Sequence, residues 1–195
     1  MDPEITNLVP VLKSYWLMIH VAIITGSYGF LGLGAILSLI IMSMNLFVTK
    51  GNVKRLFLLS KELTNVTEMT ITIGLFMLTI GTFLGGVWAN ESWGRYWGWD
   101  AKETWALASV LIYAVVLHVR FIPILKGQFA FNFLSFWAYG SIIMTFFGVN
   151  YYLSGLHSYA QGDPLPIPTW VPISIILFGV FCALSYFRWK KGQSF

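Results

Sequence analysis

The chain has 195 residues, of which 57% are hydrophobic and only 10% are charged, and its mean hydropathy is +0.72. In soluble domains about a quarter of all residues are usually charged, so this composition excludes an ordinary soluble domain. The net charge of +4 reflects orientation in a membrane rather than nucleic-acid binding. The single cysteine, Cys182, excludes an intrachain disulfide and a CxxC redox or zinc motif.

Apolar runs between charges predict five membrane-spanning helices, at about residues 15–47, 69–88, 105–119, 131–152 and 170–187. The expected fold is therefore an all-α polytopic membrane protein with one domain over residues 1–195. Between the first two spans, residues 54–64 place leucines at helical spacing, with lysines elsewhere. That pattern predicts a short helix lying at the membrane interface.

Basic residues in the connections predict the topology. Nine of them lie in segments 48–66 and 120–130 and in the C-terminal tail, against three (Lys13, Arg95 and Lys102) in the alternate set. The positive-inside rule then puts the N-terminus outside and the C-terminus in the cytoplasm. Segment 88–105 and the loop 153–168 are expected to share the outer face of a bacterial inner or plasma membrane, or of a thylakoid-type membrane.

Tryptophan is concentrated in segment 88–105. Five of the nine tryptophans lie in this 18-residue window: Trp88, Trp93, Trp97, Trp99 and Trp105. An interfacial aromatic belt would explain some of them without any ligand. Four rings (Trp93, Tyr96, Trp97 and Trp99) within seven residues instead favour a flat apolar shelf that stacks on a planar macrocycle.

Charged residues in the same segment have both structural and binding interpretations. Asp100 and Glu103 form an Asp-x-x-Glu capping box that would start the third span. Arg95 and Lys102 could receive the propionates of a macrocycle, or could simply be exposed.

The three histidines are the most informative polar residues, because imidazole in a membrane needs a partner, a cavity or a metal. His20 is expected roughly 7 to 8 Å inside the first span, on the outer side. His157 lies in the outer loop, and His118 lies near the far end of the third span, ~20 Å from Trp105. Each alone could be a hydrogen-bonded packing residue. His20 and His157 together suit an axial pair on haem iron better than a zinc site, which needs three or four clustered ligands.

The sequence Trp-Gly-Arg-Tyr-Trp-Gly-Trp-Asp at residues 93–100 resembles the WWD signature of the haem-handling superfamily. Three further segments are similar to the CcsA type: the continuation Ala-Lys-Glu-Thr-Trp-Ala-Leu, then Leu117-His118-Val-Arg120, and then Gly155-Leu-His157-Ser-Tyr159. That type is also called ResC, or the CcsA half of CcsBA, and belongs to the System II cytochrome c synthetases. The segment Tyr15-Trp-Leu-Met-Ile-His20-Val21 fits it too, and the match covers roughly residues 8–160.

This resemblance implies that His20 and His157 ligate the iron of haem b at an outer site. The shelf residues expected to bind the haem there are Trp93, Arg95, Tyr96, Trp97, Trp99, Asp100 and Lys102. It maps His118 onto an inner site through which haem passes outward. The second histidine of that inner site is expected on a CcsB/ResB-like partner or fused half.

The implied reaction joins haem vinyl groups to the two thiols of an apocytochrome c CxxCH motif. No residue resembles a catalytic nucleophile, which is consistent with catalysis by positioning. One departure is Ala101, where the family commonly has proline; a capped helix start tolerates that change.

Three alternatives remain open. A CcmC-like protein would hand haem to a chaperone without forming thioethers, and His118 with the Lys-Glu-Thr-Trp continuation distinguishes the two types. A haem-b electron-transfer anchor would need facing histidines, whereas His20 and His118 are expected at opposite depths. A structural subunit with an aromatic belt would leave the three histidines unexplained.

Overall fold

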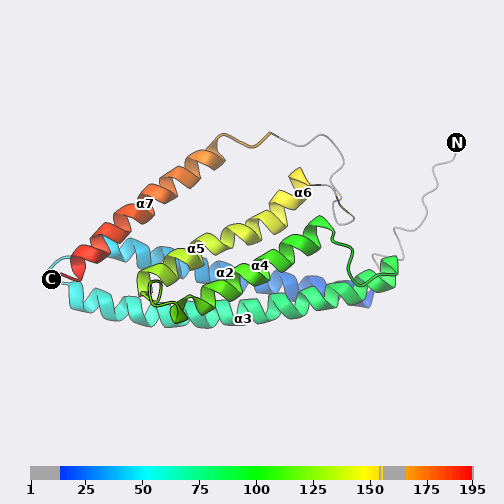
Figure 1. The fold of residues 1–195 in the computed structure, drawn as a ribbon, viewed down its shortest axis with the longest axis horizontal. Coiled ribbons are helices and arrows are strands. Elements are labelled where there is room, and N and C mark those ends of the chain that lie inside the picture. Colours follow the sequence, from blue (N-terminus) through cyan, green and yellow to red (C-terminus); the bar gives the residue numbers. More distant parts are fainter. Residues whose placement is uncertain (1–13, 154, 156–165, 195) are drawn as a thin grey trace.

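The apolar runs fold into long helices, and the computed structural model describes residues 14–153, 155 and 166–194 (Figure 1). Five helices in this part of the chain are long and apolar enough to cross a membrane, which confirms the expected all-α integral membrane fold. The helices in chain order are α2 Tyr15–Leu46, α3 Val53–Trp93, α4 Ala101–His118 with a 3-10 turn Val119–Phe121, α5 Gln128–Ile143, a π-helical turn Met144–Gly148, α6 Val149–Tyr152 and α7 Trp170–Gly192.

Helices α2 and α3 form a long antiparallel pair in which glycines permit close contact. A Cβ on Gly34 would lie 2.8 Å from Ile71, and one on Gly74 would lie 2.7 Å from Leu31. A Cβ on Gly29, by contrast, would meet nothing within 4 Å. Glycine therefore permits close contact at some positions of α2 and not at others.

The apolar core lies where α4 and α5 pack against this pair. Leu31, Leu78, Tyr113 and Phe131 come from four different helices and are each 0% exposed. At the far end of α4, Arg120 pairs with Glu68 of α3 at 2.7 Å. This ion pair holds the end of α4 to the middle of α3.

The predicted interfacial helix over residues 54–64 is wrong, because these residues form the first turns of α3. No proline or glycine interrupts the chain between Val53 and Ile73, so nothing ends the helix there. The face that packs inward carries small polar residues, Ser60, Thr64 and Thr67, rather than the leucines. The second span is accordingly the C-terminal part of a 41-residue helix.

Helix α7 packs on the others at its C-terminal half and diverges from them toward its start (Figure 1). Its buried residues are Cys182, Ser185 and Gly192, whereas Ile176 and Leu177 near its start are exposed. The α2–α3 turn and the end of α7 lie together at one end of the bundle, here named the basic end, and the α4–α5 connection lies on the same side of the bundle, set in from that end (Figure 1).

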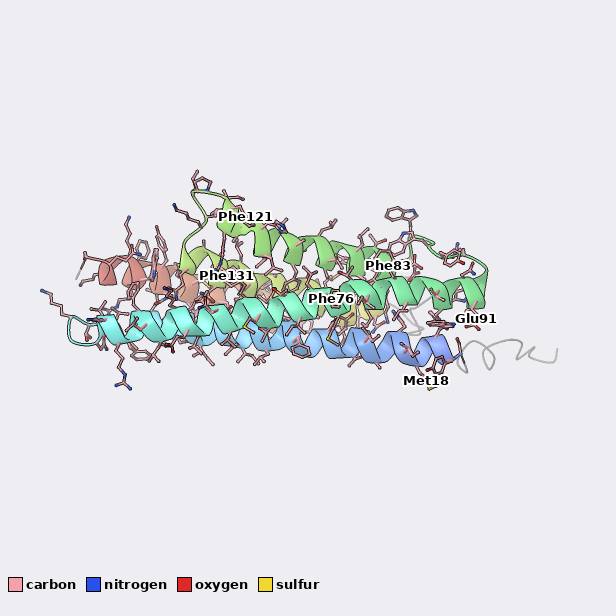
Figure 2. The ribbon with its side chains drawn as sticks, turned by 90° about the horizontal axis from the view of Figure 1, so that it is seen from below. Met18, Phe76, Phe83, Glu91, Phe121 and Phe131 are labelled. Carbon is pink, nitrogen blue, oxygen red and sulfur yellow. The ribbon has the colours of Figure 1, made fainter. Side chains whose placement is uncertain are left out.

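The opposite end, here named the tryptophan-rich end, contains the start of α2, the end of α3 and the start of α4. Met18 of α2 and Glu91 of α3 both lie at this end, while Phe121 projects from the connection after α4 (Figure 2). Ser14 donates a hydrogen bond of 2.5 Å to Glu91, which ties α2 to α3 at this end. The two ends fit the predicted separation of basic residues from the tryptophan segment; which end faces outward stays a prediction.

Candidate functional site

A cavity of about 240 Å³ opens at the tryptophan-rich end, and it is partly open to the outside. Small-molecule sites typically have 300–1,000 Å³, so a large planar ligand would fill this cavity and extend through its open mouth. Its walls come from α2, α3, the segment after α3, α4 and the π-helical turn. The residues that line it are Leu17, His20, Val21, Ile24, Thr25, Tyr28, Thr82, Gly85, Gly86, Trp88, Tyr96, Trp97, Lys102, Glu103, Ala106, Thr145 and Phe146.

His20 is the histidine in the cavity wall, and α3 orients it. Its Nδ1 lies 2.7 Å from the carbonyl oxygen of Gly81. Because a carbonyl oxygen only accepts hydrogen bonds, Nδ1 donates, and the neutral imidazole carries its lone pair on Nε2. This is the arrangement of a metal-ligating histidine, whose second nitrogen is fixed by a backbone acceptor.

The chain turns sharply after α3 and folds back over the cavity. Gly94 ends α3 with φ +71°, a left-handed conformation suited to glycine, and its N–H donates to the Asn90 carbonyl at 2.9 Å. A Cβ on Gly86 would lie 2.9 Å from the Tyr96 carbonyl oxygen, so the returning backbone rests on α3. This turn places Tyr96 and Trp97 in the cavity wall.

The tryptophans of residues 88–99 fall into three groups by their position relative to the cavity. Trp97 and the buried Trp88 line the cavity. Trp93 does not line it but packs edge-on against Trp88, with ring centroids 4.7 Å apart. Trp99 is 71% exposed and touches Trp97 edge-on at 5.8 Å. Two of the expected shelf tryptophans, Trp93 and Trp99, thus stand behind or beside the shelf rather than in it.

The predicted capping box at the start of α4 is present. The Asp100 carboxylate accepts a hydrogen bond from the Lys102 N–H, and the Glu103 carboxylate accepts from the Asp100 N–H at 3.1 Å. Glu103 also accepts from the Gly98 N–H at 2.8 Å. Two carboxylates therefore fix the shelf backbone to α4.

The two basic residues of the segment occupy different positions. Lys102 is partly buried and lines the cavity beside Glu103. Arg95 is exposed and is not a lining residue; a Cβ on Gly98 would lie 2.8 Å from its guanidinium carbon. Lys102 is the cation placed to meet an anionic group in the cavity.

His118 lies away from this cavity, at the end of α4. Arg120, two residues after His118, pairs with Glu68 of α3, whereas His20 meets Gly81 of α3. Glu68 and Gly81 are 13 residues apart, which corresponds to about 20 Å of helix. Its Nδ1 lies 2.7 Å from the Ala114 carbonyl, so its lone pair is also on Nε2. The side chain is exposed on the bundle surface. The expected opposite depths of His20 and His118 agree with these contacts.

His157 lies outside the described residues, two positions after Gly155. Gly155 itself packs against the Asp100 carboxylate, so closely that a Cβ there would overlap Oδ1. The start of the loop 153–168 is therefore in contact with the shelf segment.

Sequence reasoning missed the deep part of the cavity. Thr25, Tyr28, Thr145 and Phe146 line it below His20, and Phe146 lies in the π-helical turn, where it meets Tyr28 edge-on at 6.3 Å. π-turns often occur at functional sites. No residue pattern in segment 144–148 indicates the extra residue per turn, so the sequence offered no signal for it.

Comparison with known proteins follows the same residues. The family model described as cytochrome C assembly protein matches residues 1–157 and so includes all three histidines. This chain belongs to the cytochrome c assembly family. Among its relatives, protein NrfI of Wolinella succinogenes is 56% identical over 166 residues, which are 85% of this chain and 18% of that protein.

Other relatives carry the name cytochrome c biogenesis protein CcsA. The protein of Cyanophora paradoxa is 37% identical over 80% of this chain and 61% of its own length. That of Chlamydomonas reinhardtii is 40% identical over 80% of this chain and 44% of its own length. The predicted resemblance to the CcsA type is confirmed, and the chain spans about half the length of these two relatives.

Proposed function

We propose that this chain binds haem b in the cavity at the tryptophan-rich end and presents it for thioether attachment to an apocytochrome c. The observation that carries the proposal is His20, a histidine held by a backbone carbonyl in the wall of a mostly apolar cavity. Its Nε2 lone pair would serve as one axial ligand of the iron.

The lining suits a planar, apolar molecule with anionic edges. Trp88, Tyr96 and Trp97 offer aromatic surface, and Lys102 offers a cation for a propionate. Trp93 supports Trp88 from behind, and Asp100 with Glu103 fixes the backbone that carries the shelf. The donor set therefore fits haem, which supplies the vinyl groups that the thiols attack.

His157 is the proposed second ligand. Two peptide units span at most about 7 Å, and Gly155 contacts Asp100 beside the shelf. The loop 153–168 therefore starts close enough to bring a second imidazole to the cavity mouth.

The chain's own residues contribute positioning rather than covalent catalysis. His20 orients the iron, the aromatic walls exclude water, and the exposed cavity mouth leaves room for a CxxCH segment to approach. The lone thiol, Cys182, is buried in α7 near the basic end and takes no part.

The test is haem binding by purified protein. We expect His20→Gly and His157→Gly to lose most of the haem, and added imidazole to restore it, because the free ligand fills the missing position. Cys182→Ala, a substitution far from the cavity, should load as the wild type does. Full haem retention with an unchanged absorption spectrum in both histidine variants would rule out the outer site.

His118 supports the synthetase type over the CcmC-like alternative. Its side chain is exposed on the bundle surface and its lone pair is on Nε2, as we would expect of a ligand shared with another polypeptide. We propose that this is half of an inner transit site whose second histidine belongs to a CcsB/ResB-like partner or fused half. His118→Gly should lower haem loading in cells while the remaining haem keeps its spectrum; a normal load would contradict the transit role.

A further inference from the structure

One face of α3 surrounds the His20 ring. Gly81, Gly85 and Trp88 follow the i, i+4, i+7 spacing of a single helix face. The Gly81 carbonyl oxygen lies 2.7 Å from Nδ1, and the Trp88 indole is nearly parallel to the imidazole, with an interplanar angle of 8° at 6.3 Å. A Cβ on Gly85 would lie 2.6 Å from Cε1 and 2.8 Å from Nδ1.

Each of these contacts restricts a different freedom of the ring. The Gly81 carbonyl selects the Nδ1–H tautomer and so leaves the lone pair on Nε2. Trp88 sets the plane of the ring, and it is itself 1% exposed and packed against Trp93. Gly85 lets the imidazole lie directly on the α3 backbone, at a distance that any side chain would prevent.

We propose that Gly85, with the Gly81 carbonyl and Trp88, is a positioning seat for the axial ligand His20. Gly85 is thus a positioning residue, required for the orientation of the imidazole rather than for bringing α2 and α3 together. This inference rests on the proposed ligation of haem by His20.

Gly26 of α2 provides a matched comparison at the same contact between α2 and α3. A Cβ there would lie 2.9 Å from Cε of Met77, the terminal methyl of a flexible side chain, which can move aside. Gly26 is not a residue of the cavity wall. The same methyl at position 85 meets a ring held at one edge by a hydrogen bond.

The experiment compares Gly85→Ala with Gly26→Ala in the full chain, purified in lipid nanodiscs and titrated with haem b. We expect Gly85→Ala to weaken haem binding about 10- to 100-fold, as loss of a ligand's supporting contacts typically does. Its haem should turn from low-spin to high-spin, and imidazole should restore the low-spin spectrum. Gly26→Ala should keep the wild-type spectrum and bind within about threefold. Equal haem affinities of the two variants, with a low-spin spectrum in both, would contradict the proposed seat.

A double variant keeps the test decisive if Gly85→Ala folds poorly. In the His20→Gly background the imidazole ring is absent, so adding Gly85→Ala should lower neither the melting temperature nor the yield any further. A penalty that persists in that background would show that Gly85 serves helix packing, and would overturn the proposal.

The two proposals fail separately. If His20→Gly retains haem with an unchanged spectrum, the proposed outer site is wrong. If His20→Gly loses the ligand while Gly85→Ala binds and absorbs as the wild type does, the outer site stands and only the seat is wrong.

Discussion

Trp99 has an unusual backbone for a bulky residue. It is the one non-glycine residue with positive φ, +56°, in the described part of the chain. The left-handed conformation costs a side-chain-bearing residue roughly 1–2 kcal/mol. Neighbouring contacts hold it there: Glu103 accepts hydrogen bonds from the Gly98 and Asp100 N–H groups on either side. The strain thus results from fixing the shelf to α4.

The difference in stability between the glycine and the alanine variant should have opposite signs at Trp99 and Tyr96. Both side chains are mostly exposed, so truncation removes similar contacts. Trp99→Gly should be more stable than Trp99→Ala by about 1 kcal/mol, because glycine adopts positive φ without strain. Tyr96→Gly should instead be less stable than Tyr96→Ala by about 0.5–1 kcal/mol. Thermal melting of the four variants checks this, and the same order at both positions would contradict the strain.

At the residue scale, sequence patterns predicted which residues surround the site but not how they are held. The cavity wall contains four of the expected residues: His20, Tyr96, Trp97 and Lys102. Their positions could be predicted because they lie near helix ends and a capping box. The contact between His20 and Gly85 depends on the register of α2 against α3, 65 positions apart, and that register follows from packing. A glycine in an apolar run carries no sign of the ring that lies on it.

Small polar side chains, rather than leucines, join the helices at the basic end. Asn132 of α5 is 0% exposed, and its amide donates to the Thr64 hydroxyl of α3 and to the Gln128 carbonyl, both at 2.9 Å. Ser38 of α2 donates to its side-chain oxygen at 3.3 Å. One amide thereby connects three helices, which explains why α3 continues as a packed helix through residues 54–64.

Removal of this amide should destabilise the bundle. Asn132→Leu keeps a similar volume but removes the bonds of the amide to Ser38 and Thr64 in the other helices, and should lower the free energy of unfolding by about 1–3 kcal/mol. Asn150→Leu is the control, because the Asn150 amide donates to the Phe146 carbonyl one turn before it. Denaturation in mild detergent should show a large loss for the first variant and a small one for the second. Equal losses would mean that the connection between helices contributes little.

At the element scale, hydropathy predicted where spans exist because burial in lipid depends on composition. It did not predict that α3 is a single 41-residue helix, since serine and threonine are poor indicators of a packing face. The π-helical turn in the fourth span was missed for a related reason. The turn contacts α4 through Thr145, which meets the Ser109 hydroxyl at 3.2 Å and the Trp105 carbonyl at 3.3 Å, and hydropathy carries no sign of such a contact.

The whole molecule separates charge from the proposed site. The basic segments around residues 50–61 and residues 188–191 lie at one end, with Lys126 set in from it, and the cavity opens at the other end. The chain also covers about half the length of the CcsA relatives described above, and both His118 and the first half of α7 are exposed on the bundle surface.

The positive-inside rule turns this polarity into a topology that can be measured. With Cys182 replaced by alanine, single cysteines at Ser92 (tryptophan-rich end) and Gly51 (basic end) report the two faces, and a Cβ on Gly51 has nothing within 4 Å. In right-side-out membrane vesicles, an impermeant maleimide should label Ser92→Cys directly and Gly51→Cys only after permeabilisation. Because nine basic residues against three set this orientation, the opposite labelling would put the cavity on the cytoplasmic side. Haem would then be bound where it is supplied rather than where an exported apocytochrome could reach it, and the proposed presentation at the outer face would fail with the topology.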